Sequence, residues 1–257
     1  MGSSLFKIET VRLELPRLGR AFPGLRLAQI SDIHIGGWMN RERFKHVSDL
    51  IVAERPNVLV ITGDFVVGHR AVDLTQAALD DLTAGLSRLA DLFPTFAVLG
   101  NHDYWTDATV IRDLLAKSGV IDLTNKVFTI TRGAQNVHLC GIDDVMNGDP
   151  RLEDVLAQLP DTGAAILLVH EPDFADISAA TGRFDLQVSG HTHGGQVVLP
   201  LIGPPVLPRW GRKYPSGLYK IGEMFQYTNR GIGTGRLSIR ISCPPEITIF
   251  VLEPTPS

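Results

Sequence analysis

Apolar runs with β-strand character alternate with amphipathic stretches along most of the chain. The first expected strands are Leu25–Ser31, Asn57–Thr62, Thr95–Leu99, Ala164–Val169 and Asp185–Ser189. Helices are expected around Phe44, Val47, Leu50 and Ile51, which share one helix face, and over 72–91 and 107–117. The last third is rich in strands, expected at Gly217–Ile221, Phe225–Asn229 and Ile247–Leu252. No repeat or convincing linker interrupts this order, so we expect one α/β domain over residues 1–257.

The composition is that of an ordinary globular protein. Hydrophobic residues make up 44% of the chain and charged residues 20%, so neither a disordered nor a fibrous protein is expected. The net charge of −4 provides no overall basic field, and we expect no nucleic-acid partner. The N-terminus lacks an apolar signal core, and no window reaches the roughly 18 apolar residues of a spanning helix. We therefore expect a cytoplasmic protein as the chain is given, or a peripheral membrane or exported one if a natural leader has been removed.

Side chains that commonly bind metals follow five of the expected strands. Ligands in open α/β sheets bind outside the carboxyl ends of the strands, so these side chains are expected to share one site. Carboxylate, imidazole and amide groups gathered in this way suit a site for two divalent metals. The residues are Asp32 and His34, Asp64, Asn101 with His102, His170, and His191 with His193.

Three of these motifs are weak when each is taken alone. On an extended backbone Asp32 and His34 would point to the same side and could share a cation, but for this motif alone a capping Asp beside a surface His is the favoured interpretation. Asp64 could cap the following helix, and His170 could be a buried core histidine.

Two motifs are more specific. Gly190-His-Thr-His-Gly-Gly-Gln196 places two histidines in a glycine-rich turn, where they can reach different metals. Gly100-Asn-His-Asp103 sets an amide ligand beside a histidine that is free for proton transfer. The occurrence of all five clusters in this order makes coincidence implausible.

Together, the motifs resemble those of the calcineurin-like metallophosphoesterase family over about residues 25–195. The resemblance implies a two-sheet mixed β-sandwich flanked by helices, in four layers, with a dimetal centre at the strand ends. Carried over residue by residue, it assigns Asp32, His34 and His193 to the first metal, Asp64 to a bridge, and Asn101, His170 and His191 to the second.

The mixed oxygen and nitrogen ligands suit two divalent cations such as Mn²⁺, Fe or Zn²⁺. Such a pair can bind phosphate oxygens and lower the pKa of a bridging water from about 15.7 towards 7, which gives a hydroxide nucleophile. In the family the counterpart of His102 assists the leaving group as a general acid. The family's protein phosphatases orient this histidine with an Asp three residues after the bridging Asp. This chain has Val67 there, which leaves open whether Asp103 takes that role.

The resemblance implies a metal-dependent phosphodiesterase in which Asp64 and His102 are catalytic. A second resemblance, to the bacterial phosphodiesterase-like branch of the family, rests on His170-Glu-Pro-Asp173, Ser189–Gln196, Arg230-Gly-Ile-Gly233 and Cys243-Pro-Pro-Glu246. This second resemblance leaves open an alternative function, that of a pyrophosphatase acting on a lipid-linked nucleotide of the UDP-diacylglucosamine type. A non-catalytic metal-binding scaffold is less expected, because all seven ligands and His102 are present.

The substrate is expected to be a small-molecule or lipid-linked phosphodiester, with Tyr104, Trp105 and Arg230 as candidate contacts. Residues 197–208 are apolar and contain four prolines, which exclude a regular helix or central strand. We favour a loop packed on the core. The alternatives are an acyl pocket or a peripheral membrane contact through 197–214, where Trp210, Arg212, Lys213 and Tyr214 would form an aromatic and basic rim.

Overall fold

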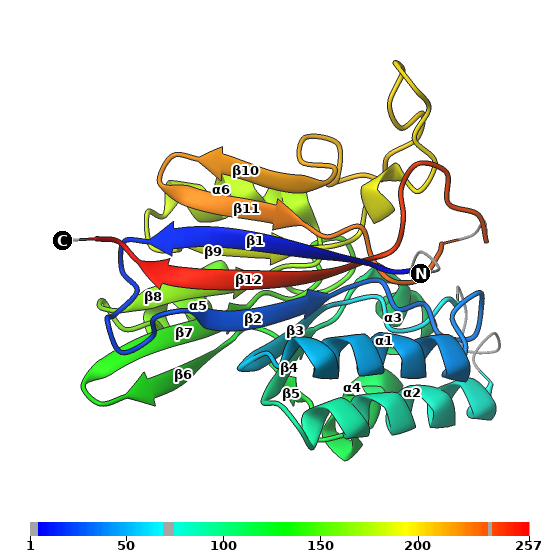
Figure 1. The fold of residues 1–257 in the computed structure, drawn as a ribbon, viewed down its shortest axis with the longest axis horizontal. Coiled ribbons are helices and arrows are strands. Elements are labelled where there is room, and N and C mark those ends of the chain that lie inside the picture. The colour runs from blue at the N-terminus through cyan, green and yellow to red at the C-terminus, as the bar shows by residue number, and fades with distance from the viewer. Residues whose placement is uncertain (1–4, 69–74, 236–237, 257) are drawn as a thin grey trace.

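Two mixed β-sheets form the centre of the molecule in a computed structural model that describes residues 5–68, 75–235 and 238–256 (Figure 1). Within these residues each sheet has six strands. The first sheet has the order β1 (Lys7–Leu15), β12 (Glu246–Pro254), β2 (Leu25–Ile30), β3 (Val58–Thr62), β4 (Thr95–Val98) and β5 (Ile121–Asp122). The second has the order β10 (Gly217–Ile221), β11 (Met224–Thr228), β9 (Leu186–Ser189), β8 (Ala164–Leu168), β7 (Gln135–Gly141) and β6 (Lys126–Arg132).

Most neighbouring strands are parallel. In the first sheet only β12 and β2 pair antiparallel, and in the second only the two edge pairs, β10 with β11 and β6 with β7, do so. The carboxyl ends of the central strands of each sheet therefore lie at one end of the molecule, where ligands of α/β folds bind.

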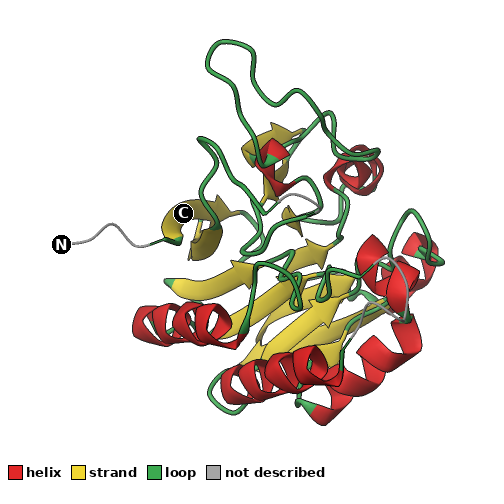
Figure 2. Ribbon diagram, turned by 90° about the vertical axis from the view of Figure 1, so that its right-hand side faces the viewer, coloured by secondary structure: helices red, strands yellow, loops and turns green. Residues whose placement is uncertain are grey.

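Helices cover the outer face of each sheet, which gives the expected four layers (Figure 2). The first sheet packs against α1 (Arg41–Glu54), α2 (Gln76–Ala90) and α4 (Ala108–Lys117). The second packs against α5 (Leu152–Gln158) and α6 (Ala175–Ala180). The short helix α3 (Asn101–Thr106) and the 3-10 turns Pro172–Phe174 and His193–Gly195 follow β4, β8 and β9.

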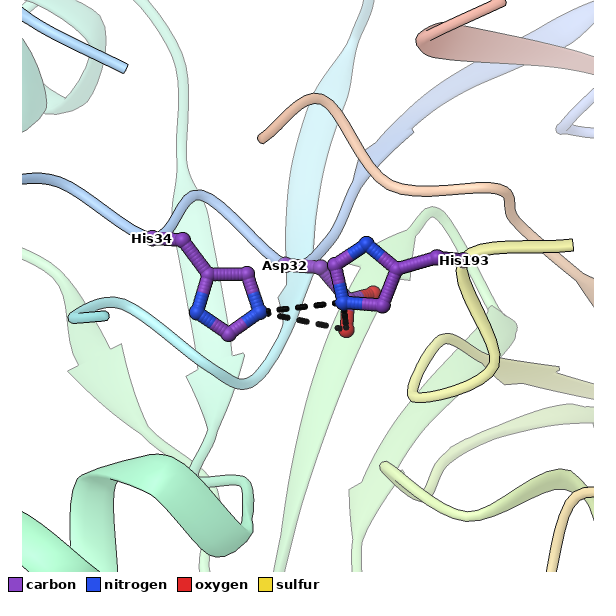
Figure 3. A group of neighbouring side chains, drawn as sticks. All are labelled: Asp32, His34 and His193. Carbon is purple, nitrogen blue, oxygen red and sulfur yellow. Dashed lines mark hydrogen bonds and ion pairs between the residues drawn. The ribbon is translucent and has the colours of Figure 1, made fainter. Parts of the chain in front are cut away.

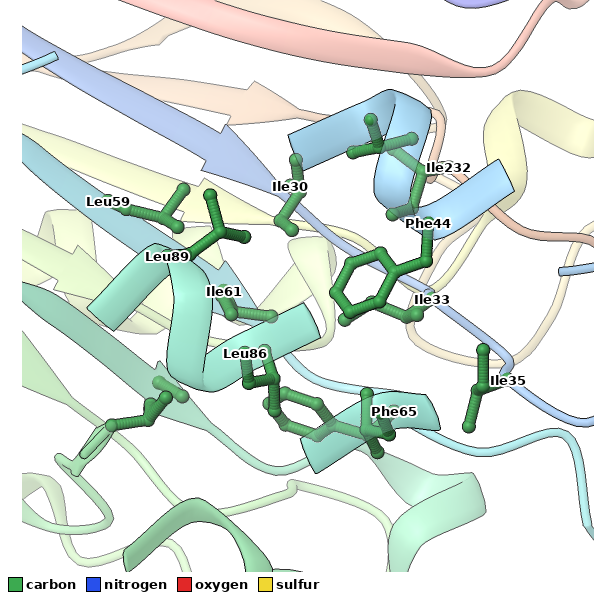
Figure 4. Close-up of a cluster of buried hydrophobic side chains, with 14 of the residues drawn as sticks. Ile30, Ile33, Ile35, Phe44, Leu59, Ile61, Phe65, Leu86, Leu89 and Ile232 are labelled. Carbon is green, nitrogen blue, oxygen red and sulfur yellow. The ribbon is translucent and has the colours of Figure 1, made fainter. Parts of the chain in front are cut away.

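The apolar strands contribute to two cores at once, because successive side chains of a strand point to opposite faces. In β3, Leu59 and Ile61 face the helices of the first sheet, where they pack with Phe44 and Leu86 (Figure 4). The alternate residues of β3 face the second sheet in a separate cluster. This burial on both faces explains why the central strands are continuous apolar runs.

Side-chain caps fix the start of the three large helices. Asn40 accepts a hydrogen bond from the N–H of Arg43, and Thr75 accepts one from Ala78. Asp107 accepts from Thr109 and Val110 at the start of α4. Each cap satisfies an N–H that the first helical turn leaves without a partner.

The fold class expected from the sequence is confirmed, and so are the positions of the central strands. The expected helix over 72–91 is observed as α2, and its first residues, 72–74, lie outside the described residues. The hydrophobic pattern did not reveal β1, β5, β6 or the short helices. Strand β6 is an edge strand whose residues are exposed or half-buried, so it lacks an apolar run. No helix of the described residues is long and apolar enough to cross a membrane.

Tight packing between the turns after β3 and β4 generates a first prediction. A Cβ on Gly100 would lie 2.4 Å from Asp64 Oδ1 and 2.7 Å from His170 Cε1. Gly100→Ala should therefore displace the Asp64 carboxylate, lower the free energy of unfolding by about 1–3 kcal/mol and reduce bound divalent metal. Urea unfolding and elemental analysis measure the two effects.

Gly182→Ala is the control for this prediction. Gly182 has φ 64°, and a methyl group added there would meet nothing within 4 Å, so this change adds backbone strain without crowding. It should lower stability and leave metal content unchanged. Equal metal content in the two variants would contradict the expected crowding at Gly100.

Candidate metal centre

The seven candidate ligands converge at the carboxyl ends of the two sheets. The first sheet supplies Asp32 and His34 after β2, Asp64 after β3, and Asn101 after β4. The second supplies His170 after β8 and the pair His191 and His193 after β9. All are buried except His193, which is partly buried. The site is thus shared between the sheets and depends on their packing.

Five of the seven ligands have left-handed backbone conformations. The φ values are 50° for Asp32, 48° for His34, 57° for Asp64, 73° for His191 and 53° for His193. The expectation that Asp32 and His34 project from an extended strand was therefore wrong, since β2 ends at Ile30. Non-glycine residues occupy this region at an energetic cost, which is commonly found at functional sites.

Asp32, His34 and His193 form one group that could hold a cation (Figure 3). The Nε2 atoms of the two histidines lie 3.1 Å apart, and Asp32 Oδ1 lies 3.4 Å from His193 Nε2 and 4.0 Å from His34 Nε2. The rings of His34 and His193 are stacked, with their centroids 4.9 Å apart. One carboxylate oxygen and two ring nitrogens thus point at the same small volume.

Asp64 connects this group to a second one. Its Oδ2 atom lies 3.5 Å from His34 Nε2 and 3.3 Å from His170 Nε2. Among the described residues, Asn101 Oδ1 and His170 Nε2 are buried and have no hydrogen-bond partner. The ring of His191 packs edge-on against that of His170 at 4.9 Å. Buried polar atoms normally have a hydrogen-bond partner, so the Asn101 oxygen and the His170 nitrogen fit a second cation.

Backbone carbonyls fix the orientation of three of the histidines. His34 Nδ1 donates to Val66 O at 3.1 Å, His170 Nδ1 to Thr62 O at 2.6 Å, and His191 Nε2 to Arg209 O at 2.8 Å. A carbonyl only accepts hydrogen bonds, so these nitrogens carry a proton, and in a neutral imidazole the opposite ring nitrogen then presents a lone pair. Hydrogen bonds of this kind typically orient metal-binding histidines. No sequence signal could have revealed them, because every residue carries a carbonyl.

Burial sets the charge state of the site. It lowers the pKa of His34 to about 3 and that of His191 to about 4, so both imidazoles are neutral at pH 7. Burial raises the pKa of Asp32 to about 6. Burial opposes ionisation of Asp64, but the charges of His170 and His102 outweigh it and hold the pKa of Asp64 well below its usual value. Burial opposes protonation of His170, but the charge of Asp64 outweighs it and holds the pKa of His170 well above its usual value. A cation bound there must displace that proton, whereas His34 and His191 are already neutral.

The backbone carbonyl of Val67 contacts His102 at the position where the family's protein phosphatases have an Asp. His102 Nδ1 lies 3.4 Å from Val67 O, and its ring packs against those of His34 and Trp105, each at 4.7 Å. Its backbone N–H donates to Asp64 Oδ1 at 2.9 Å. The histidine is thus held beside the candidate metal ligands by contacts on several sides.

Asp103 has a different role from the one left open by the sequence. Its carboxylate accepts backbone hydrogen bonds from Asp64 and Gly100, both at 2.9 Å, and from Phe65 at 2.8 Å. Burial and the charge of Asp64 raise the pKa of Asp103 to about 8. Asp103 therefore ties the turn after β3 to the turn after β4 and does not orient His102.

A cavity of about 650 Å³ opens over the candidate metal residues. Its polar part includes Asp64, Asn101, His102, His191 and His193. Its apolar wall includes Trp105, Met146, Val197, Pro205, Val206 and Pro208. Met146 comes from the loop after β7, where no sequence motif pointed to the site. The cavity thus combines a polar floor with a hydrophobic side.

The structure brings only one of the three candidate substrate contacts to this cavity. Trp105 lines it and donates from Nε1 to Asn147 Oδ1 at 3.1 Å. Tyr104 lies outside the cavity lining, where its hydroxyl donates to Asp143 and accepts from Arg112. Arg230 is also absent from the lining.

Two carboxylates bind the Arg230 guanidinium. It pairs with Glu246 and, at 2.8 Å, with Glu9. These ion pairs involve both terminal strands, since Glu9 lies in β1 and Glu246 in β12. The contacts of Arg230 are therefore structural in this arrangement.

The expectation of a core-packed loop at residues 197–208 was wrong. None of these residues is buried, and Leu201 and Ile202 are strongly exposed. In the adjoining segment, Tyr214 is buried, with its hydroxyl bonded to Asp176, and Lys213 pairs with the same carboxylate at 2.7 Å. The prolines were correctly taken to exclude regular structure, but the direction of the apolar side chains does not follow from composition.

Known proteins share both the sequence pattern and the fold. Residues 25–195 match the pattern of the calcineurin-like phosphoesterase family. The uncharacterized metallophosphoesterase YkuE of Bacillus subtilis is 35% identical over 236 residues, covering 91% of this chain and 81% of its own. The phosphodiesterase YaeI of Escherichia coli is 31% identical over 230 residues, covering 87% of this chain and 80% of its own.

The solved structure of TT1561 from Thermus thermophilus superposes with a TM-score of 0.51. It covers 80% of this chain and 89% of its own at 12% identity, which shows a shared fold alone. The family match spans more than half of the chain and includes all seven candidate ligands. This chain therefore belongs to the calcineurin-like phosphoesterase family.

Proposed function

We propose that the protein is a metal-dependent phosphodiesterase that holds two divalent cations. The first would be held by Asp32, His34 and His193, the second by Asn101, His170 and His191, and Asp64 would bridge them. One observation carries the proposal: buried carboxylates and oriented histidine lone pairs converge on the same volume. Such a set of acceptors is stable only with cations or protons between its members. The mixed oxygen and nitrogen donors suit Mn²⁺, Fe or Zn²⁺.

The chain's own residues would orient the substrate and move the proton. Two cations bound here would polarise phosphoryl oxygens and supply hydroxide from water near neutral pH. The Nδ1 atom of His102 lies 3.4 Å from Val67 O, a contact that orients the ring beside the cavity. His102 lines the cavity beside Asp64, so it is placed to protonate the leaving oxygen as a general acid.

The shape of the cavity favours a diester over a monoester. A diester carries a substituent on each side of phosphorus, and the cavity extends from the metal residues along Trp105, Met146 and Val206. This wall can bind the second substituent by apolar contact. The name of the relative YaeI, a phosphodiesterase, supports the same reaction class.

A pyrophosphatase acting on a lipid-linked nucleotide of the UDP-diacylglucosamine type is the second candidate. It is favoured by the apolar wall that Val197, Pro205 and Val206 add to the cavity, which is suited to an acyl chain. The reaction products separate the candidates, since a pyrophosphatase releases two phosphomonoesters from a diphosphate.

Metal-restored hydrolysis tests the proposed reaction. Metal-stripped protein should cleave bis(p-nitrophenyl) phosphate faster than p-nitrophenyl phosphate once Mn²⁺, Fe²⁺ or Zn²⁺ is returned. Asp64→Asn keeps the shape of the bridge but loses its charge, and should lower turnover by at least about 100-fold and reduce bound metal. Asp185→Asn, another buried Asp, is the matched control and should keep its metal. No cleavage despite two bound metals would count against a general diesterase.

Removal of the proposed acid should separate metal binding from catalysis. His102→Ala should keep its metal content and lose about 10²- to 10⁴-fold in rate on a diester with an alkyl leaving group. The loss should be smaller for p-nitrophenolate, which leaves without a proton. His46→Ala, at an exposed position on α1, is the control. Equal losses for both leaving groups would exclude an acid role for His102.

Metal affinity should fall as the pH falls. Burial raises the pKa of Asp32 to about 6, so below that pH a proton neutralises this carboxylate and competes with the cation. Above it the carboxylate is charged and binds freely. If cation binding displaces one proton from Asp32, the affinity for the cation should drop by roughly tenfold for each pH unit below this pKa. Isothermal titration with Zn²⁺ at about pH 5.5 and about pH 7.5 measures the change, and equal affinities would contradict the assignment of Asp32.

A further inference from the structure

An apolar loop projects from the end of the molecule that carries the metal residues. The loop comprises residues 197–208 and stands out in yellow at the upper right of Figure 1. Leu201 is fully exposed, and Ile202 and Val206 are 74% and 76% exposed. Ile239, in the neighbouring segment, is 59% exposed. Scattered exposed apolar residues are ordinary, but several gathered on adjoining loops indicate a contact surface.

Backbone hydrogen bonds hold the base of the apolar loop. Val198 N donates to Ile241 O at 3.0 Å, and Ile241 N donates to Gln196 O at 3.0 Å. Nearer the tip, Leu199 N donates to Gly203 O at 3.0 Å. The four prolines of residues 197–208 further restrict the chain. The loop is therefore built to display its apolar side chains, and these bonds resist its collapse onto the core.

Basic residues adjoin the loop in the sequence, although the net charge of the chain is −4. Arg209 and Arg212 directly follow the loop and are exposed. Neither forms a salt bridge within the described residues, whereas Lys213 is paired with Asp176. An exposed apolar tip with unpaired basic residues is complementary to an anionic lipid surface.

The loop also forms part of the cavity. Pro205, Val206 and Pro208 line the cavity over the metal residues, while Leu201 and Ile202 extend beyond it. A surface in contact with the tip would thus lie at the cavity mouth. The tip is convex and aliphatic, which suits penetration between lipid headgroups, whereas the cores of protein interfaces are enriched in aromatic residues.

We propose that the apolar loop inserts into the headgroup region of an anionic membrane, with Leu201 and Ile202 among the acyl chains and Arg209 and Arg212 at the phosphates. Ile239 would add contact beside the loop. Docking in this way would turn the cavity towards the membrane surface. This docking depends on the surface of the molecule and is independent of the reaction at the metal residues.

Vesicle flotation tests this docking directly. The whole chain should float with vesicles that contain phosphatidylglycerol, and bind less to phosphatidylcholine alone or at high salt. Leu201→Asp should weaken binding by roughly tenfold or more, because it replaces an inserted apolar side chain with a charge that anionic lipid repels. Arg209→Glu should weaken binding to anionic vesicles only.

Leu92→Asp is the matched control. Leu92 is 54% exposed and precedes β4, so it lies at the opposite, amino end of the strands. The Leu92→Asp variant should bind vesicles as well as the unchanged protein does, and thermal melting should show that all variants are folded.

Three results would overturn the proposal. The first is absence of vesicle binding by the unchanged protein, and the second is an equal loss of binding in Leu92→Asp and Leu201→Asp. The third is self-association in analytical ultracentrifugation that Leu201→Asp abolishes without any vesicle binding, which would assign the loop to a second copy of the chain. The readout is bound protein and not turnover, so none of these results depends on the proposed reaction.

Discussion

The constraint on which the rest of the structure depends is the burial of a cluster made almost wholly of acceptors. The carboxylates of Asp32 and Asp64 face the Nε2 atoms of His34 and His170 within 4 Å or less. Each buried polar atom without a hydrogen-bond partner lowers the stability of the fold by about 1–3 kcal/mol. The side chains of such a cluster would therefore move apart unless rigid surroundings held them in place. The structure supplies those surroundings from two sheets whose strands are apolar on both faces.

The immediate frame of the cluster is made of backbone. Asp103 joins the turns after β3 and β4 through three N–H groups, and carbonyls fix the ring orientation of three histidines. Glycine also makes possible the close approach of the turns after β2 and β9, since a Cβ on Gly190 would lie 2.4 Å from Asp32 Oδ2. The ligands are thus held by contacts that do not depend on flexible side chains, which gives the preorganisation that catalytic sites need.

The sequence predicted the central strands, and which side chains gather at their ends, better than the geometry of those side chains. Hydrophobic runs located β2, β3, β4, β8 and β9 because these strands are buried on both faces. Edge strands such as β6, which lack that burial, left no comparable signal. The turn that aims Asp32 and His34 was mistaken for extended backbone, since left-handed φ values are a tertiary effect at non-glycine residues. The contact between His102 and the Val67 carbonyl could not be predicted for a simpler reason. Sequence motifs identify side chains, and this contact is made by a backbone group that every residue carries.

Two departures from ordinary folding rules occur at the same end of the molecule. Acceptors are buried without donors at the strand ends, and Leu201 and Ile202 are exposed on the loop beside them. Each departure lowers the stability of the isolated chain, and each is relieved by a different external species, cations in the first case and an apolar medium in the second. Violations of this kind are expected where function opposes stability. Val206 belongs to both the loop and the cavity wall, so the proposed metal chemistry and the proposed surface contact would act on one bound molecule.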